Sequence, residues 1–289
     1  MSSAPSPYQQ TLNINEALKA GSSRLQRVSK SAHFDAQVLL AHIFDVERAW
    51  LLAHSEEALN QAQQKQWEAS LARIEGGEAL PYVLGVWEFY GLAFCITKDV
   101  LIPRPETELL VEVAIDWLAA HPGKRSAVDV GTGSGCIALS MAVNVPDLEI
   151  TASDISEKAL LVAARNIEHH KVGELVSLVQ SDQLEKISGP IDLICANLPY
   201  IPSQRLSKLA VAKREPLLAL DGGEDGLDQI RSFLHQASAK LASGGLLLAE
   251  IDDSHQESAR AVASKCIPKG KISVRKDLAG RTRLLQVEA

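Results

Sequence analysis

The sequence has few cysteines and no long hydrophobic run, and both absences exclude classes of protein. The four cysteines are widely separated in the sequence: Cys95, Cys136, Cys195 and Cys266. This spacing excludes a zinc site of the CxxC type, so we expect no bound metal. We expect buried, reduced thiols instead. No apolar run approaches the roughly 18 residues that a membrane-spanning helix needs. The first eight residues also lack the basic and apolar regions of a secretory leader. We therefore expect a cytoplasmic protein without a membrane partner.

Basic residues are outnumbered as well. The chain carries 29 Lys and Arg against 36 Asp and Glu, which gives a net charge of -7. Residues 1–95 carry 7 basic and 10 acidic side chains, so the N-terminal part is not a basic domain either. Because nucleic-acid binding relies on clustered Lys and Arg that neutralise phosphates, we expect no direct, stable binding of nucleic acid.

The N-terminal third is predicted to be helical. Between residues 13 and 77 apolar residues recur at spacings of three and four, and Gly76-Gly77 is a strong signal for the end of the last helix. This pattern predicts a small helical domain over residues 1–77. Aromatic and β-branched residues then surround Gly85 and Gly91, which predicts a strand pair over residues 81–97 inside a β-hairpin linker at residues 78–100.

The rest of the chain, residues 101–289, alternates predicted helices with seven predicted strands. Such alternation predicts an α/β fold, a doubly wound, mostly parallel seven-stranded sheet whose ligand binds at the C-terminal ends of the strands. The predicted strands are 127–130, 149–153, 176–180, 191–196, 246–251, 272–275 and 283–287, and the predicted helices are 106–120, the segment after the glycine loop to 143, 157–170, 227–241 and 256–263.

A glycine-rich loop follows the first of these strands. It reads Asp129-Val-Gly131-Thr132-Gly133-Ser134-Gly135, and its glycines allow the backbone to approach a ligand closely. Asp154 ends the next strand, where a carboxylate can accept both hydroxyl protons of a ribose. A dinucleotide fingerprint would have its third glycine at Cys136, so the spacing resembles the S-adenosylmethionine loop of class I methyltransferases. A glycine turn used only for packing is the plainer interpretation.

A second motif, Asn197-Leu198-Pro199-Tyr200, directly follows the strand 191–196. An amide nitrogen is a poor nucleophile because its lone pair is delocalised, so an enzyme must hold the NH2 group with that lone pair facing the methyl donor. The side-chain oxygen of Asn197 and a backbone carbonyl of the turn can each accept one N–H, while Tyr200 covers the flat face of the group. Orientation of this kind can supply much of the acceleration of a methyl transfer. A plain Asn-Pro turn at the end of a strand is the alternative.

Two further segments give the chain a specific resemblance. Together with the motifs above, Val100–Glu108 (VLIPRPETE) and Glu215–Leu227 (EPLLALDGGEDGL) resemble signatures of the release factor glutamine methyltransferases, and Gly244–Ile251 is similar too. The resemblance covers essentially the whole chain. It implies transfer of a methyl group from S-adenosylmethionine to the side-chain amide nitrogen of a glutamine in a Gly-Gly-Gln motif, with peptide chain release factors as protein substrates. It also implies that the helical domain helps to bind the release factor.

The resemblance also implies roles for individual residues. Gly131, Thr132, Gly133, Ser134 and Gly135 would line the methionine end of the cofactor, Asp154 would bind the ribose and Gln183 would lie by the adenine. The turn Asn197 to Tyr200 would receive the glutamine, with Asn197, Pro199 and Tyr200 as catalytic residues, Leu198 as a further contact, and Asn197 also beside the cofactor. Residues 103–108 would form a lip over the cofactor, or simply a proline turn before a helix.

Three positions depart from the family pattern, and three other functions remain as alternatives. Leu198 stands where the family has proline, Asp252 and Asp253 where it tends to have glycine, and Gln183 where an aromatic residue is frequent.

The leading alternative is an N6-adenine methyltransferase acting on RNA or DNA, because Asn-Leu-Pro-Tyr also occurs in adenine dimethyltransferases. A nicotinamide-dependent dehydrogenase and a cofactor-binding module without catalysis are the other two.

Overall fold

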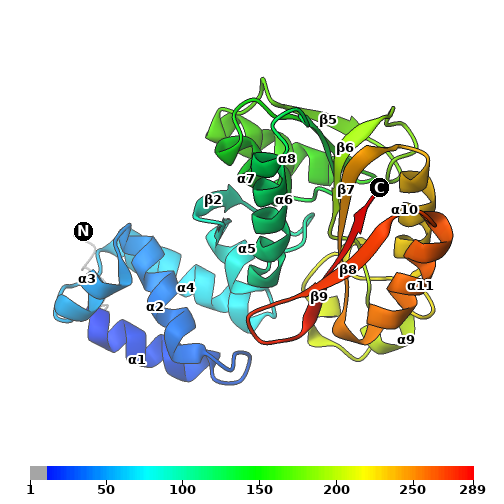
Figure 1. The fold of residues 1–289 in the computed structure, drawn as a ribbon. Coiled ribbons are helices and arrows are strands. Elements are labelled where there is room, and N and C mark those ends of the chain that lie inside the picture. Colours follow the sequence, from blue (N-terminus) through cyan, green and yellow to red (C-terminus); the bar gives the residue numbers. More distant parts are fainter. Residues whose placement is uncertain (1–11) are drawn as a thin grey trace, which may run out of the picture. The chain divides into compact units, whose positions relative to one another are not determined.

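The computed structural model describes residues 12–289, and the chain divides into two compact units, residues 1–84 and 85–289 (Figure 1). Residues 1–11, on which the expectation about a secretory leader rests, lie outside the described part. Each unit has its own hydrophobic core, as separate domains require. The division falls after Leu84, seven residues beyond the predicted end of the helical domain at residue 77.

The first unit is entirely helical in the part that the structure describes. Asn13 and Asn60 each accept a backbone N–H three residues later and form capping boxes with Glu16 and Gln63, which explains where two of the helices begin. Gly21 allows close packing, because a Cβ there would lie 2.4 Å from the ring of Trp67. The helices are α1 (Ile14–Leu25), α2 (Ala32–Phe44), α3 (Arg48–Ala53), α4 (Gln61–Glu75) and α5 (Leu80–Leu84).

The predicted strand pair over residues 81–97 is wrong in its first part. Residues Leu80–Leu84 form helix α5, and only β1 (Val86–Phe89) and β2 (Leu92–Cys95) form the hairpin. Val83 and Leu84 pack against the core of the helical unit, so tertiary contacts override the strand preference of a β-branched residue. The hairpin belongs to the second unit, where the amide of Asn166 bonds both N and O of Cys95, at 2.7 and 2.9 Å.

The second unit contains a seven-stranded sheet with helices on both faces (Figure 1), which confirms the predicted fold class. The strand order is β5-β4-β3-β6-β7-β9-β8, and β9 runs antiparallel to both of its neighbours. Helices α6, α7 and α8 cover one face, and α10 and α11 cover the other. The strands are β3 (Ser126–Val130), β4 (Glu149–Asp154), β5 (Val176–Gln180), β6 (Ile191–Ala196), β7 (Leu241–Glu250), β8 (Lys271–Lys276) and β9 (Thr282–Glu288); the helices are α6 (Glu108–Ala120), α7 (Cys136–Asn144), α8 (Glu157–His170), α9 (Ser203–Leu206), α10 (Asp228–Ser238) and α11 (Gln256–Cys266).

The register of the central strands gathers three loops at one edge of the sheet. Val130 at the end of β3 is paired with Ser153 of β4 and with Ala196 of β6, so these strands end side by side. The segments that follow them start at Gly131, Ile155 and Asn197. The doubly wound fold therefore places the glycine loop, Asp154 and the Asn-Leu-Pro-Tyr turn next to one another.

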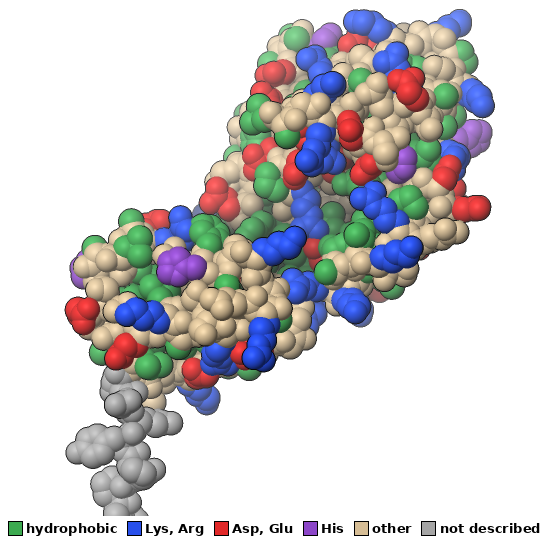
Figure 2. All heavy atoms as spheres, turned by 90° about the horizontal axis from the view of Figure 1, so that it is seen from below, with side chains coloured by type: hydrophobic (Ala, Val, Ile, Leu, Met, Phe, Trp, Pro, Cys, Tyr) green, Lys and Arg blue, Asp and Glu red, His purple; other side chains and the backbone are tan. Residues whose placement is uncertain are grey.

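Four further features of the described residues concern membrane helices, metal-binding groups, cysteines and surface charge. No described helix is long and apolar enough to cross a membrane, and no group of three His, Cys, Asp or Glu side chains within residues 12–289 could hold a metal ion. The four cysteines are free thiols. On the face drawn in Figure 2, Lys and Arg side chains lie interspersed with Asp and Glu.

Candidate active site

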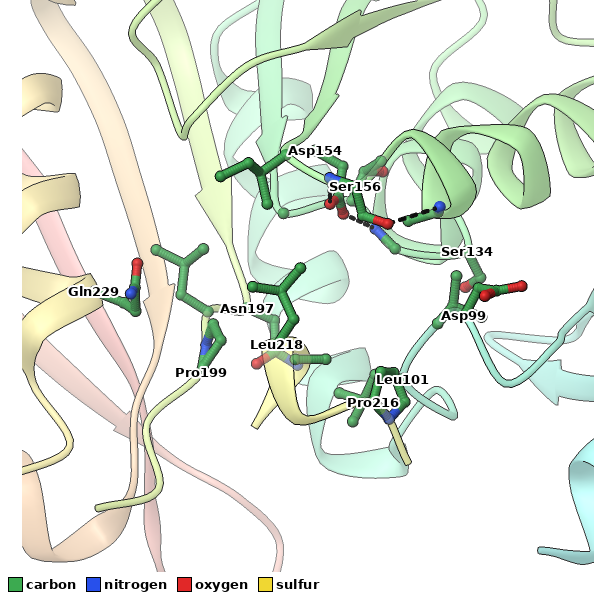
Figure 3. A pocket seen from close by; sticks show the side chains of 18 of the residues that line it. Asp99, Leu101, Ser134, Asp154, Ser156, Asn197, Pro199, Pro216, Leu218 and Gln229 are labelled. Carbon is green, nitrogen blue, oxygen red and sulfur yellow. Dashed lines mark hydrogen bonds between the residues drawn. The ribbon is translucent and has the colours of Figure 1, made fainter. Parts of the chain in front are cut away.

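A cavity of about 700 Å³ opens at the C-terminal edge of the parallel strands (Figure 3). The loops after β3, β4, β5 and β6 line it, together with residues from the segments 98–107 and 216–223 and from the start of α10. Most of the predicted site residues line it: Gly131, Thr132, Gly133, Ser134, Asp154, Gln183, Asn197, Leu198 and Pro199. Gly135 and Tyr200 do not. The structure thus brings predicted site residues up to 68 positions apart in the sequence to one cavity.

The glycine loop bends sharply away from β3 into helix α7. Gly131 and Gly135 have φ angles of 71° and 84°, which favour glycine over any residue with a Cβ. At Gly135 a Cβ would also lie 2.7 Å from Cδ1 of Leu139. Gly135, the N-cap of α7, therefore allows close packing of the helix start, whereas Gly131 and Gly133 face the cavity.

Asp154 holds the glycine loop and the start of α8 together. Its Oδ2 accepts the backbone N–H of Gly133 and its Oδ1 that of Ser156, both at 2.9 Å (Figure 3). Desolvation by burial raises the pKa of Asp154, while these backbone hydrogen bonds lower it. Each oxygen of a carboxylate can accept more than one hydrogen bond, so both keep acceptor capacity toward the cavity.

Asp129 lies beneath the same loop and is fully buried. Its Oδ2 accepts hydrogen bonds from the Thr132 hydroxyl, at 2.6 Å, and from the N–H of Ala138, at 3.2 Å. Its Oδ1 has no hydrogen-bond partner among the described residues. Burial raises the pKa of Asp129 to about 7.

The Asn-Leu-Pro-Tyr turn begins one residue after β6 and lies at the boundary of two cavities. Asn197, Leu198 and Pro199 line both the large cavity and a neighbouring one of about 120 Å³, while Tyr200 lines only the smaller. The side-chain N–H of Asn197 donates to the hydroxyl of Thr107, at 3.0 Å. Within residues 12–289 no hydrogen bond reaches the Asn197 Oδ1 or the carbonyl of Leu198. Two acceptors of the turn are thus available to a ligand.

Tyr200 is oriented by a buried carboxylate. Its hydroxyl donates to Glu250 Oε1 at 3.1 Å, and burial followed by the charge of Glu250 raises its pKa. No sequence motif assigns a role to Glu250, although it lies in the family-like segment Gly244–Ile251. Only the observed contact shows that this segment reaches the turn.

The segment Glu215–Leu227 supports the site from two sides. A Cβ at Gly222 would lie 2.7 Å from Cα of Tyr200, and one at Gly226 would lie 2.5 Å from its carbonyl oxygen, so these glycines let the segment pack on the backbone of the turn. At its other end, Glu215 accepts the N–H of Ile102 at 3.1 Å and pairs with Arg104 at 2.5 Å. This segment therefore fixes both the turn and the strip that precedes α6.

Only part of the segment 103–108, predicted as a lip over the cofactor, lines the cavity. Pro103, Arg104 and Thr107 line the large cavity, whereas Glu106 and Glu108 do not. Glu108 instead accepts the backbone N–H of Tyr90 at 2.9 Å, so it ties the hairpin to α6. The proline-turn interpretation holds for this glutamate, since residues Pro105–Thr107 form a 3-10 turn that leads into the helix.

Gln183 lines the cavity, but its amide is already occupied. It donates to the carbonyl oxygen and to the Oε1 of Gln229, at 3.1 and 3.0 Å, and accepts from Gln236 at 3.2 Å. Gln229 also lines the cavity, opposite Asp99 in Figure 3, and sequence reasoning missed it. No sequence signal marked Gln229, because it lies in the first turn of an ordinary amphipathic helix.

Comparisons with known proteins identify the family of the chain. Two family models match the chain, the PrmC N-terminal domain over residues 16–85 and the methyltransferase small domain over residues 106–214. A release factor glutamine methyltransferase of Coxiella burnetii is 39% identical over 285 residues, which are 95% of this chain and 98% of that protein. One of Deinococcus radiodurans is 35% identical over 279 residues, 95% of this chain and 98% of the relative. The chain belongs to the release factor glutamine methyltransferase family. It uses S-adenosylmethionine as methyl donor.

Solved structures share the fold with this family member at low identity. The hMettl16 catalytic domain, in complex with a MAT2A 3'UTR hairpin, matches with a TM-score of 0.55 and 14% identity, over 81% of this chain and 84% of that one. A methyltransferase from Pyrococcus furiosus matches with a TM-score of 0.51 and 20% identity, over 76% and 98% of the two chains. These likenesses support the methyltransferase fold.

The departures at Asp252 and Asp253 have a local structural reason in this family member. Asp252 caps the short turn that precedes α11 by accepting the N–H of Ser254 at 3.0 Å. Asp253 accepts the N–H of Thr282 at 2.7 Å, which ties the turn to the start of β9. Both carboxylates thus stabilise the chain after β7, and neither lines the cavity.

Proposed function

We propose that the protein methylates the side-chain amide nitrogen of the glutamine in the Gly-Gly-Gln motif of peptide chain release factors. The observation that carries this proposal is the pair of available acceptors in the turn, the Asn197 side-chain oxygen and the Leu198 carbonyl. A primary amide has two N–H groups, so two acceptors can hold its plane and direct the nitrogen at a methyl donor. An adenine amino group presents the same two N–H donors, so family membership decides between the substrates.

The proposed cofactor contacts follow from the fit of the cavity. Asp154 lines the cavity and keeps acceptor capacity for a ribose diol. Gly131 to Ser134 would line the methionine end, and Gln183 with Gln229 would border the adenine. When bound, S-adenosylmethionine supplies the methyl group on its sulfonium sulfur. Asn197, Pro199 and Tyr200 would then position the acceptor glutamine in the turn.

The helical unit would bind the release factor, and the reaction would take place in the cytoplasm, where release factors are present. A short peptide that contains Gly-Gly-Gln can occupy the turn but cannot contact a separate domain. We therefore expect the intact release factor to have a much lower KM than such a peptide, with a kcat of the same order. Equal KM values for the two substrates would contradict a role of the helical unit in substrate binding.

The experiment that tests the function supplies one donor and several acceptors. The protein is incubated with methyl-labelled S-adenosylmethionine and either a release factor, the same factor with its Gly-Gly-Gln glutamine replaced by alanine, or ribosomal RNA. We expect one methyl group on that glutamine, found by peptide mass spectrometry, and no label on the substituted factor. Label on another residue, or on RNA alone, would refute the proposal and favour the adenine methyltransferase alternative.

A further inference from the structure

We propose that Thr107 and Glu250 are positioning residues that hold the amide of Asn197 in one of its two orientations, with the oxygen toward the acceptor. This inference rests on the proposed function of Asn197. It gives a role to two family-like segments, Val100–Glu108 and Gly244–Ile251, that the cofactor contacts leave without one.

The three residues form a continuous chain of hydrogen bonds. The Thr107 hydroxyl lies 2.6 Å from Glu250 Oε2 and 3.0 Å from Asn197 Nδ2. The other carboxylate oxygen, Oε1, receives the hydroxyl of Tyr200 at 3.1 Å. Glu250 therefore holds both ends of the catalytic turn, Tyr200 directly and Asn197 through Thr107.

The direction of these bonds follows from the number of protons. Burial raises the pKa of Glu250, while the hydrogen bonds from Thr107 and Tyr200 lower it. In its ionised form the Glu250 carboxylate can only accept, so the single proton of the Thr107 hydroxyl must point at Glu250. The hydroxyl then has only lone pairs left for Asn197, and only the NH2 side of the amide can bond to it. With its NH2 group at Thr107, the amide turns its oxygen the other way, toward the cavity. The opposite orientation would place two acceptors against each other.

Burial makes this arrangement selective. Thr107 and Glu250 are each only 2% exposed, so water cannot readily replace a lost hydrogen-bond partner of either side chain. Asn197 is partly buried and lines the cavity. The closeness of Asn197 and Glu250 follows from the fold. Ala196 of β6 is paired with Ala249 of β7, and Asn197 and Glu250 are the next residues along each chain.

The first test removes the hydroxyl of Thr107 without changing the shape of the side chain. Thr107→Val leaves Asn197 free to adopt either orientation, and we expect kcat to fall by about tenfold or more, with the KM for the release factor and the Kd for S-adenosylmethionine little changed. Thr107→Ser restores the hydroxyl and should keep kcat within about threefold of the original protein. A kcat of Thr107→Val close to normal would overturn the proposal.

A double-mutant cycle separates positioning from a general structural effect. Asn197→Ala alone should lower kcat by about 10² or more. If Thr107 acts through Asn197, adding Thr107→Val to Asn197→Ala should change kcat by no more than about twofold. Losses that multiply in the double variant would show that Thr107 acts independently of Asn197, which would refute the inference.

Glu250→Gln tests the origin of the orientation. A glutamine can donate its N–H to Thr107, so the hydroxyl proton is released to point at Asn197 and favours the reversed amide. We expect kcat to fall by about tenfold or more in a folded protein that still binds S-adenosylmethionine. Unchanged turnover in Glu250→Gln would overturn the role of Glu250.

A measurement without substrate distinguishes failure of this inference from failure of the proposed function. In protein labelled with ¹⁵N-asparagine, the Asn197 side-chain amide resonances are those absent from Asn197→Ala. Thr107→Val should shift them and speed their hydrogen exchange relative to Thr107→Ser. Unchanged resonances would refute the positioning role even if methylation is observed, whereas a shift without any methylation of release factors would refute only the proposed function.

Discussion

The side chain of Leu198 lies against Gly131, so close that a Cβ on the glycine would be 3.0 Å from Cδ2 of the leucine. This contact joins the Asn-Leu-Pro-Tyr turn to the glycine loop. Leu198 is 5% exposed and belongs to the core of the second unit, so its side chain has a structural role that the sequence did not indicate.

Gly131→Ala should destabilise both the protein and its cofactor site. The φ of 71° costs a residue with a Cβ about 1 to 2 kcal/mol, and the close approach to Leu198 adds to this. We expect the free energy of unfolding, measured by urea denaturation, to fall by about 1 to 3 kcal/mol. In a Leu198→Ala background, whose own loss of packing is measured separately, Gly131→Ala should keep only the backbone cost. If Gly131→Ala costs nothing in that background, the backbone part of the explanation is wrong.

Asp154→Ala should weaken S-adenosylmethionine binding by about 1.5 to 3 kcal/mol, the usual range for a hydrogen bond to a charged group. The alanine also releases the N–H groups of Gly133 and Ser156, which should loosen the loop. Titration calorimetry measures the affinity, and Asp253→Ala is a matched control because that carboxylate lies outside the cavity. Tight binding of NAD and none of S-adenosylmethionine by the original protein would refute the cofactor assignment.

Asp129 should make stability depend on pH in a defined direction. Burial raises its pKa from 3.8 to about 7, so between these values the folded protein keeps a proton that the unfolded chain releases. Its contribution to stability is therefore complete below about pH 3.8 and is lost as the pH rises toward 7. Asp129→Asn, which keeps an acceptor for Thr132 and Ala138, removes this dependence.

The free energies of unfolding of the original protein and of Asp129→Asn are compared by urea denaturation between pH 5 and 8.5. We expect the unfolding free energy of Asp129→Asn, relative to the original, to increase by a few kcal/mol as the pH rises to about 7 and to stay constant above it. Curves that run parallel over this range would mean that Asp129 is ionised in the folded protein at all these pH values.

Leu198→Pro should change kcat by no more than about tenfold, which corresponds to a change of about 1.4 kcal/mol in the activation free energy. If residue 198 acts through its backbone carbonyl, its side chain need only keep the turn extended, and Pro199 already disfavours the α region for the residue before it. Leu198→Ala is the matched control, since it also loses the packing on Gly131 but adds no ring. A folded Leu198→Pro protein that is as inactive as Asn197→Ala would mean that the leucine side chain acts in the reaction itself.

The sequence by itself determined the local elements and the chemistry of the motifs. Helix Glu157–His170 and strands Val176–Gln180 and Ile191–Ala196 have the predicted bounds, because apolar periodicity is a property of neighbouring residues. The glycine loop, Asp154 and Asn197 were also predicted to share a site, since the ends of parallel strands meet at one edge of a sheet.

Only the tertiary structure decided which side chains face one another. Leu80–Leu84 is helical because it packs on the helical core. Gly135 packs close to Leu139, and Tyr200 bonds to Glu250 and lines the smaller cavity, so neither lines the large one. Thr107 and Glu250 are 143 residues apart, and no periodicity specifies that they meet. A sequence pattern fixes which face of an element is apolar, whereas the partner of a buried polar group depends on how whole elements pack.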